Sequence, residues 1–154
     1  MYIWLTTVLV VVLDRISKLL VVNNLDIGES LEVIPGFFYF TYIRNPGAAF
    51  GMLAGKQWFF VIIAFIVVTA IIYFQKSISK DLKAIRICLG LIGGGALGNL
   101  FDRLFIGEVV DFLDFRVWSY IFNIADSAIV VGGFLLILLI YKHERIRGEN
   151  NGSV

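Results

Sequence analysis

Four long apolar stretches constrain how this chain folds, and they cover residues 1–22, 58–74, 85–101 and 124–141. A helix that crosses the hydrocarbon core of a bilayer needs about 20 mostly apolar residues, and each stretch comes near that length. The chain is 59% hydrophobic and only 16% charged, whereas about a quarter of the residues in a soluble domain are charged. The sequence therefore predicts an all-α integral membrane protein with four transmembrane helices, folded as a single domain over residues 1–154.

The charges of the connecting segments predict the orientation of these helices. Residues 75–86 include four basic residues and one acidic residue, and residues 142–154 add three more basic residues. The segments 23–57 and 102–123 together have seven acidic residues and four basic ones. Because cytoplasmic loops carry an excess of Lys and Arg, we expect both termini and the middle connection in the cytoplasm and the two longer loops on the outer side.

An aromatic segment at residues 31–43 predicts a hairpin within the first outer loop. Two β-favouring runs flank Pro35-Gly36, a dipeptide that is typical of a type II turn. Aromatic residues also anchor membrane proteins at the interface with water. The segment therefore fits either an interfacial anchor or a small β-cradle that holds a ligand at the membrane surface.

Glycines recur through the third apolar stretch. Residues 93–98 formally match the G-x-G-x-x-G pattern of dinucleotide-binding loops, but that pattern has this meaning only between a strand and a helix. A position inside a membrane span excludes this interpretation. Gly90, Gly94 and Gly98 recur at every fourth residue, a spacing of small residues that lets helices approach closely. We expect these glycines to form a helix–helix contact.

Polar and charged side chains gather toward the outer ends of the predicted helices. An ionisable side chain inside a span is costly unless it is paired or faces water. Three groups have members three or four residues apart, and each group shares one helical face: Asp14 with Lys18, Asn99 with Asp102 and Arg103, and Asn123 with Asp126. The first group fits either a self-paired couple at the interface or part of a site. The last group fits either a helix N-cap with an acid in the first turn or two residues of a site.

The carboxylates at this outer end suggest a hydrolytic chemistry. Two carboxylates held a few ångströms apart in a poorly solvated site share one proton, because both cannot ionise easily. The ionised member then removes a proton from water while the protonated member polarises a carbonyl group. Carboxylates also suit Mg²⁺ or Mn²⁺. A metal site is therefore the alternative, and it would draw on Asp102, Asp111, Asp114 and Asp126.

Five motifs in this chain resemble those of the bacterial signal peptidase II family, also called lipoprotein signal peptidases. They are 14-DRISK-18, 44-RNPGAAFG-51, 98-GNLFDR-103, 107-GEVVDF-112 and 123-NIADSA-128. Each motif alone is weak, but five motifs in the family's order are specific, and they run nearly end to end along the chain. The resemblance implies an aspartic endopeptidase with four spans in the bacterial cytoplasmic (inner) membrane. It also implies an active site near the outer face and an extracytoplasmic β-cradle at the aromatic segment.

The resemblance further implies roles for individual residues. The family's catalytic aspartates fall on Asp111 and Asp126. The residues expected to bind substrate or to support the site are Asn45, Gly47, Asn99, Arg103, Asn123, Asp14, Lys18 and Asp102. No cofactor and no metal ion is implied. Asp114 is not matched to a functional position, and we expect it to face water or Arg116.

The substrate that the resemblance implies is a prolipoprotein whose lipobox cysteine carries diacylglycerol. The enzyme is expected to cleave the peptide bond just before that cysteine, as a monomer in contact with membrane lipid. The net charge of +1, together with the lack of a basic arm, gives no indication of a nucleic-acid partner. The alternative function is a small proton- or cation-coupled transporter that uses the same carboxylates as a relay.

Overall fold

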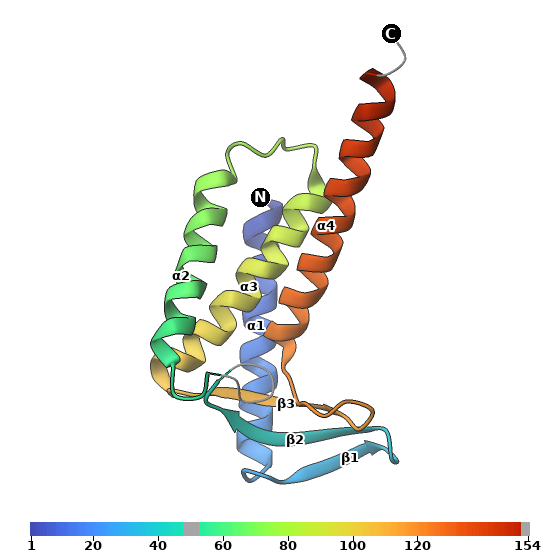
Figure 1. Cartoon of the computed structure of the whole chain (residues 1–154). Coiled ribbons are helices and arrows are strands. Elements are labelled where there is room, and N and C mark those ends of the chain that lie inside the picture. Colours follow the sequence, from blue (N-terminus) through green and yellow to red (C-terminus); the bar gives the residue numbers. More distant parts are fainter. Residues whose placement is uncertain (48–52, 152–154) are drawn as a thin grey trace.

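The computed structural model describes residues 1–47 and 53–151, which form four helices and one small sheet (Figure 1). The helices are α1 (Tyr2–Asn24), α2 (Gln57–Phe74), α3 (Lys83–Phe105) and α4 (Ile124–Asn151), and the strands are β1 (Ser30–Ile34), β2 (Phe38–Asn45) and β3 (Val109–Phe115). The sheet lies across one end of the helices, opposite the start of α1 and the α2–α3 connection (Figure 1). Residues 48–51 of the second motif lie outside the described residues.

The helices contain the predicted apolar stretches, but two of them are longer than expected. α3 continues past residue 101 to Phe105 and thereby includes Asp102 and Arg103. Asp102 is tolerated there although it is fully buried, because it is paired with cations of α1. α4 continues past residue 141 to Asn151, since the intervening polar residues include no proline that would end the helix.

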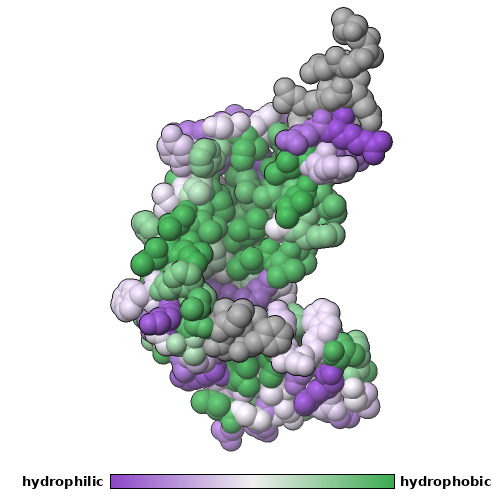
Figure 2. Space-filling view, viewed as in Figure 1, coloured by the Kyte–Doolittle hydropathy of each residue, from purple (hydrophilic) through white to green (hydrophobic). Residues whose placement is uncertain are grey.

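An apolar belt crosses the middle of the helices, with hydrophilic residues at both ends (Figure 2). Within the described part of the chain, three helical segments are long and apolar enough to cross a membrane, namely Gln57–Phe74, Lys83–Phe105 and Ile124–Lys142. The charged residues of α1 keep that helix out of this group. Its outward positions are nevertheless apolar and exposed, as at Leu9 and Leu13. The structure thus has three apolar candidate spans and a fourth helix whose charges are directed toward its neighbours.

The sheet is antiparallel with the strand order β1-β2-β3. The predicted hairpin joins β1 to β2, and its Gly36 has a φ of 69°, as the third residue of a type II turn requires. β3 pairs with β2 and places Asp111 opposite Ile43. This third strand lies in a segment that we expected to be an outer loop. The all-α prediction, with β-structure only between the first two helices, is therefore incomplete.

α3 is the central helix and packs against α1, α2 and α4 (Figure 1). Its glycines explain how closely the helices approach. A Cβ atom at Gly94 would lie 2.6 Å from the Cβ of Val10 in α1. On the adjacent face of α3, about 100° around the helix axis, a Cβ atom at Gly95 would overlap the backbone oxygen of Ala125 in α4. The predicted glycine contact is confirmed, and it involves two neighbouring helices.

A cluster of four ionic side chains links α1 to α3. Lys18 Nζ lies 2.8 Å from Asp14 Oδ2 and 2.8 Å from Asp102 Oδ2, and Arg15 Nη1 lies 2.7 Å from Asp102 Oδ1. The backbone N–H of Ala125 donates to Asp14 Oδ1 at 3.0 Å, which extends the link to α4. The cluster thus contains two cations and two carboxylates, and each charge has a partner of opposite sign. This pairing offsets the cost of holding these charges away from water.

Gly95→Ala is expected to lower the thermal stability, because the new Cβ would force α3 away from α4. Overpacking of this kind costs about 1–3 kcal/mol. Gly133→Ala is the matched control, since a Cβ at that position meets nothing within 4 Å and alanine favours a helix by about 1 kcal/mol over glycine. We expect the apparent Tm in detergent to fall for Gly95→Ala and to stay level or rise for Gly133→Ala. Equal shifts in the two variants would contradict the packing argument.

Lys18→Met is expected to destabilise the fold by about 3–5 kcal/mol, because Asp14 and Asp102 would remain buried without their shared cation. Denaturant unfolding in detergent measures this loss. The double variant Asp14→Asn/Lys18→Met removes one carboxylate as well and should recover part of the stability. If the double variant were no more stable than Lys18→Met, unpaired charge would not be the cause.

Candidate active site

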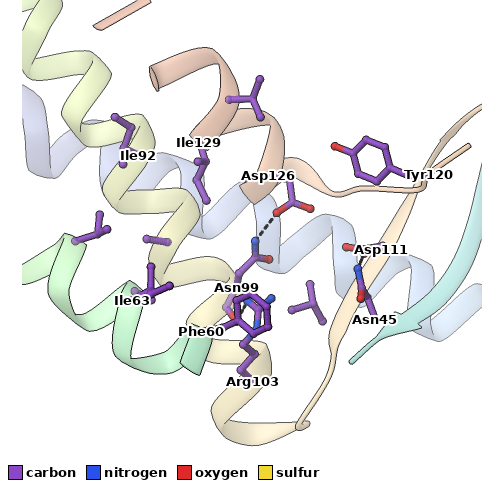
Figure 3. A pocket seen from close by; sticks show the side chains of 15 residues that line it. Asn45, Phe60, Ile63, Ile92, Asn99, Arg103, Asp111, Tyr120, Asp126 and Ile129 are labelled. Carbon is purple, nitrogen blue, oxygen red and sulfur yellow. Dashed lines mark hydrogen bonds between the residues drawn. The ribbon is translucent and has the colours of Figure 1, made fainter. Parts of the chain in front are cut away.

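One cavity of about 340 Å³ lies between α2, α3, α4 and the sheet (Figure 3). Side chains such as Ile63, Ile92 and Ile129 form its apolar wall. Its polar lining consists of Asn45, Asn99, Arg103, Asp111, Tyr120 and Asp126. The two aspartates that the sequence singled out thus face the same cavity, although one comes from β3 and the other from the first turn of α4.

Asp111 is 1% exposed and is held by two asparagine side chains. Asn45 Nδ2 donates to its Oδ2 at 2.9 Å, and Asn123 Nδ2 donates to its Oδ1 at 2.6 Å. The first contact follows from the register of the sheet. Asp111 lies opposite Ile43, so Asn45 is its diagonal neighbour two residues further along β2, within reach on the same face.

Asp126 occupies the first turn of α4 in a capped helix. Asn123 Oδ1 accepts a hydrogen bond from the Asp126 backbone N–H at 2.8 Å, which confirms the predicted N-cap. The carboxylate of Asp126 does not take part in that cap. Its Oδ1 instead accepts a hydrogen bond from Asn99 Nδ2 of α3 at 2.7 Å, within the cavity (Figure 3). Asn123 therefore caps the helix and also bonds to Asp111, while Asp126 lines the cavity, so both interpretations of this pair are correct.

The side chains of Asn99 and Asn123 connect the two aspartates. Asn123 Nδ2, which bonds to Asp111, also lies 3.1 Å from Asn99 Oδ1. Asn99 in turn donates to Asp126. Lys18 Nζ donates to Asn99 Oδ1 at 3.1 Å, so the chain of hydrogen bonds continues into the buried ionic cluster. These bonds fix the orientation of both carboxylates.

Arg103 brings a positive charge to the cavity. Its guanidinium carbon lies 4.6 Å from the ring centre of Phe60, and its Nη2 donates to the backbone oxygen of Gly47 at 3.1 Å. The Gly47 N–H donates to Asn45 Oδ1 at 3.0 Å. Gly47 is therefore held between Arg103 and Asn45, and the permanently charged guanidinium lies on the wall that it shares with the aspartates.

The electrostatic environment of Asp111 favours its protonated form. Burial, and secondly the charge of Asp126, raise the pKa of the Asp111 carboxyl from 3.8 to about 7. The hydrogen bonds from Asn45 and Asn123 and the charge of Lys18 act in the opposite direction without cancelling this effect. A carboxyl with a pKa near neutrality exchanges its proton at physiological pH, as general acid–base chemistry requires.

Other predicted residues lie behind or beside the cavity. Asp14, Lys18 and Asp102 form the buried ionic cluster behind the site. Lys18 bonds to Asn99, and the backbone N–H groups that precede the two site aspartates, those of Val110 and Ala125, donate to Asp102 and Asp14. Asp114 lies elsewhere on β3, where Thr41 Oγ1 donates to its Oδ2 at 2.7 Å and Arg116 Nη2 lies 3.5 Å away. We expected Asp114 to face either water or Arg116. It is buried and lies beside Arg116, so the second expectation is confirmed and the first is wrong.

The carboxylates of the alternative metal site have different partners. Among the side chains that the structure describes, no three acidic, histidine or cysteine side chains form a group suited to hold a metal ion. Asp102 is bound to Arg15 and Lys18, and Asp114 to Thr41. Of these four carboxylates, Asp111 and Asp126 line the cavity, whereas Asp102 and Asp114 do not.

Sequence reasoning missed Tyr120 and Phe60, which both line the cavity. Phe60 lies in a uniformly apolar stretch, and Tyr120 lies among other aromatic residues between β3 and α4. Neither residue belongs to one of the five motifs. The sequence contains no local signal that would separate them from their neighbours, because their place in the cavity depends on how α2 and the outer segment fold back onto α3.

Comparison with known proteins places this arrangement in a family. A family model described as Signal peptidase (SPase) II matches residues 6–142. A protein of Desulfitobacterium hafniense named lipoprotein signal peptidase is 54% identical over 148 residues, which cover 96% of this chain and 98% of that protein. A protein of Halothermothrix orenii with the same name is 41% identical over 145 residues, covering 94% and 98%.

Two solved structures share both fold and sequence with this chain, and each is described as a bacterial membrane enzyme determined by the in meso method. The one at 2.3 Å resolution has a TM-score of 0.85 at 41% identity and covers 90% of this chain and 86% of that one. The one at 1.9 Å resolution has a TM-score of 0.80 at 42% identity and covers 88% and 90%. The chain therefore belongs to the signal peptidase II family of aspartic peptidases.

Proposed function

We propose that this protein removes the signal peptide from diacylglyceryl-modified prolipoproteins by cleaving the peptide bond just before the lipidated cysteine. Its relatives named lipoprotein signal peptidase, which it matches over nearly their full length, support this substrate class. The observation that carries the proposal is the arrangement of Asp111 and Asp126. They face one cavity and are joined through the amides of Asn123 and Asn99.

In the proposed reaction the aspartate pair activates a water molecule. The ionised carboxylate takes a proton from water as its oxygen attacks the carbonyl carbon of the scissile bond, while the protonated carboxyl donates to the carbonyl oxygen. The tetrahedral intermediate then collapses. Its carbon–nitrogen bond breaks, and the departing amine of the lipidated cysteine receives a proton from the pair. No covalent intermediate with the enzyme forms in this scheme.

The surrounding polar residues have supporting roles in this proposal. Asn45, Asn99 and Asn123 hold the two carboxylates in place through the hydrogen bonds described above. Arg103, with Gly47 bound to it, contacts the substrate backbone and offers positive charge where the intermediate becomes negative. The ionic cluster of Asp14, Lys18 and Asp102 supports Asn99 from behind.

The proposal places the site near the outer face of the bacterial cytoplasmic membrane. α1 is the fourth span, because its charges are paired inside the protein and its outward positions are apolar. The start of α1 and the α2–α3 connection lie at one end (Figure 1), and the basic residues of the connection direct that end to the cytoplasm. The sheet and the aspartate pair then lie at the outer end. In this proposal the enzyme acts as a monomer.

The apolar wall of the cavity suits a lipid-modified substrate. It is formed by α2, α3 and α4, through residues such as Ala64, Ile92 and Val130. A lipidated cysteine held at the aspartate pair would keep its acyl chains among these apolar surfaces or in the adjoining bilayer. A transporter is less consistent with this wall, because a proton or cation relay needs polar side chains where the cavity is lined by isoleucine, valine and alanine.

Asp111→Asn and Asp126→Asn are each expected to slow cleavage by about 100- to 10,000-fold, because each removes one partner of the proton transfer. The assay follows a diacylglyceryl-modified precursor in detergent and compares it with the same precursor without the lipid. We expect the wild type to cleave only the lipidated form and to retain its activity in chelator. Asp114→Asn is the matched control, since it changes a carboxylate of the same strand outside the cavity, and it should cleave normally.

A different experimental result would contradict each part of the proposal. Normal cleavage by either catalytic variant would remove that aspartate from the mechanism. Equal cleavage of both precursors would remove the requirement for lipid. Loss of activity in chelator would indicate a metal-dependent hydrolase, and proton flux in liposomes without precursor would support the transporter.

The stability of the wild type is expected to fall as the pH rises from about 4 to about 7 and then to level off. The folded protein holds the Asp111 proton up to a pKa of about 7, against an ordinary value of 3.8, so the folded state binds more protons than the unfolded state across this interval. The loss amounts to as much as about 4 kcal/mol. Asp111→Asn lacks this group, so its apparent Tm relative to wild type should be higher at pH 8 than at pH 5. A difference that stays constant with pH would contradict the protonation of Asp111.

A further inference from the structure

Tyr120 lines the cavity together with Asp111 and Asp126, although no motif of the sequence marks it. It lies on the segment between β3 and α4. Figure 3 shows its ring entering the cavity from this segment, with the hydroxyl end directed toward Asp126. The side chain is partly buried, so it is neither enclosed by the protein nor fully open to solvent.

The backbone around Phe122 fixes the position of Tyr120. The Phe122 oxygen accepts hydrogen bonds from the N–H groups of Phe112 at 3.0 Å and Leu113 at 2.7 Å, and the Phe122 N–H donates to the Leu113 oxygen at 3.2 Å. Side chains two residues apart on an extended chain point to the same side. The rings of Tyr120 and Phe122 accordingly contact each other, with centroids 5.4 Å apart.

An aromatic stack anchors this contact to the sheet. The ring of Phe122 stacks on that of Phe115 in β3, with centroids 5.8 Å apart and an interplanar angle of 11°. Asp111 belongs to the same strand, and Asn123, which bonds to it, directly follows Phe122. Tyr120 is therefore attached to the elements that position both aspartates, so its hydroxyl has a defined place relative to them.

The hydrogen-bond donors of the cavity differ in what they bind. The side-chain amides of Asn45 and Asn99 donate to the carboxylates of Asp111 and Asp126. Arg103 donates to the backbone oxygens of Gly47 and Asn99 but carries further N–H groups. A phenol both donates and accepts, and its hydroxyl rotates to suit the partner. Arg103 and Tyr120 both place hydrogen-bond donors on the cavity lining, where a substrate carbonyl would lie.

A phenol can donate a hydrogen bond to a carbonyl only while it keeps its proton, and the surroundings of Tyr120 favour the protonated form. Burial, followed by the charges of Asp126 and Asp111, raises the pKa of the Tyr120 phenol above its ordinary value of 10. The phenol therefore keeps its proton throughout the neutral and mildly alkaline range. In this form it can donate a hydrogen bond, and it does not compete with the aspartates as a base.

We propose that Tyr120 is a further catalytic residue whose hydroxyl donates a hydrogen bond to the carbonyl oxygen of the scissile peptide. The inference rests on the proposed function, because it assigns a role within the hydrolysis by Asp111 and Asp126. The bond strengthens as that oxygen becomes negative in the tetrahedral intermediate, so it lowers the barrier more than it tightens substrate binding. The proton stays on the phenol, and no bond of the tyrosine is formed or broken.

Tyr120→Phe tests this role because it keeps the ring and removes the hydroxyl. We expect kcat on the diacylglyceryl-modified precursor to fall by about 100-fold, as for the loss of one donor to an oxyanion, with little change in KM. The apparent Tm should stay close to that of the wild type, since the ring and its contact with Phe122 are kept. Tyr39→Phe is the matched control. The Tyr39 hydroxyl bonds to Glu32 on the sheet, outside the cavity lining, so its kcat should be unchanged.

The outcomes separate this proposal from the one on which it rests. If the wild type cleaves the lipidated precursor and Tyr120→Phe has the same kcat, the role of Tyr120 is wrong and the proposed function stands. A rise in KM at constant kcat would also overturn it, because the hydroxyl would then contribute only to ground-state binding. If the wild type fails to cleave the precursor, or if Asp111→Asn cleaves it normally, the proposed function itself fails.

Discussion

Asn123 uses both ends of its side-chain amide, and the geometry of the site depends on this. The oxygen caps α4 by accepting the N–H of Asp126, while the nitrogen donates to Asp111 and lies within hydrogen-bonding distance of Asn99. One fully buried side chain therefore sets where α4 begins, where its first-turn aspartate lies and how that aspartate relates to β3. An aspartate at this position would accept at the cap but would place a second carboxylate against Asp111. A glutamine would be longer by one methylene group and would displace one of the two contacts.

The features that sequence predicted well are those determined by local geometry. The cap formed by Asn123, the pairing of Asp14 with Lys18 and the turn at Pro35-Gly36 each involve residues at most four apart, and the helix or turn itself brings them together. The apolar stretches were also predictable, because a span of the bilayer imposes a length and a composition. The motifs around Asp111 and Asp126 identified a family, and the fold confirms that both aspartates face one cavity.

The features that sequence left open depend on pairings between distant segments. β3 pairs with β2 across more than 60 residues, and an alternating apolar run such as 109–115 fits an outer loop as readily as a strand until its partner is known. Asp102 is tolerated in α3 only because Arg15, 87 residues earlier, and Lys18 neutralise it. Tyr120 enters the cavity because Phe122 binds the backbone of β3. In each case the decisive partner is remote, and no periodicity within either segment reveals it.

The glycines of α3 have a mechanical consequence for the molecule. α1, α3 and α4 touch backbone to backbone or nearly so at Gly94 and Gly95, and such contacts have no side chains that could adjust to a displacement. α2 packs along α3 through large apolar side chains, and it also supplies one wall of the cavity, including Phe60 and Ile63. A displacement of α2 would widen the cavity and leave the glycine contacts of α3 with α1 and α4 intact, whereas a displacement of α4 would break them. We therefore expect α1, α3 and α4 to move as one unit, and any widening of the cavity to come from a displacement of α2.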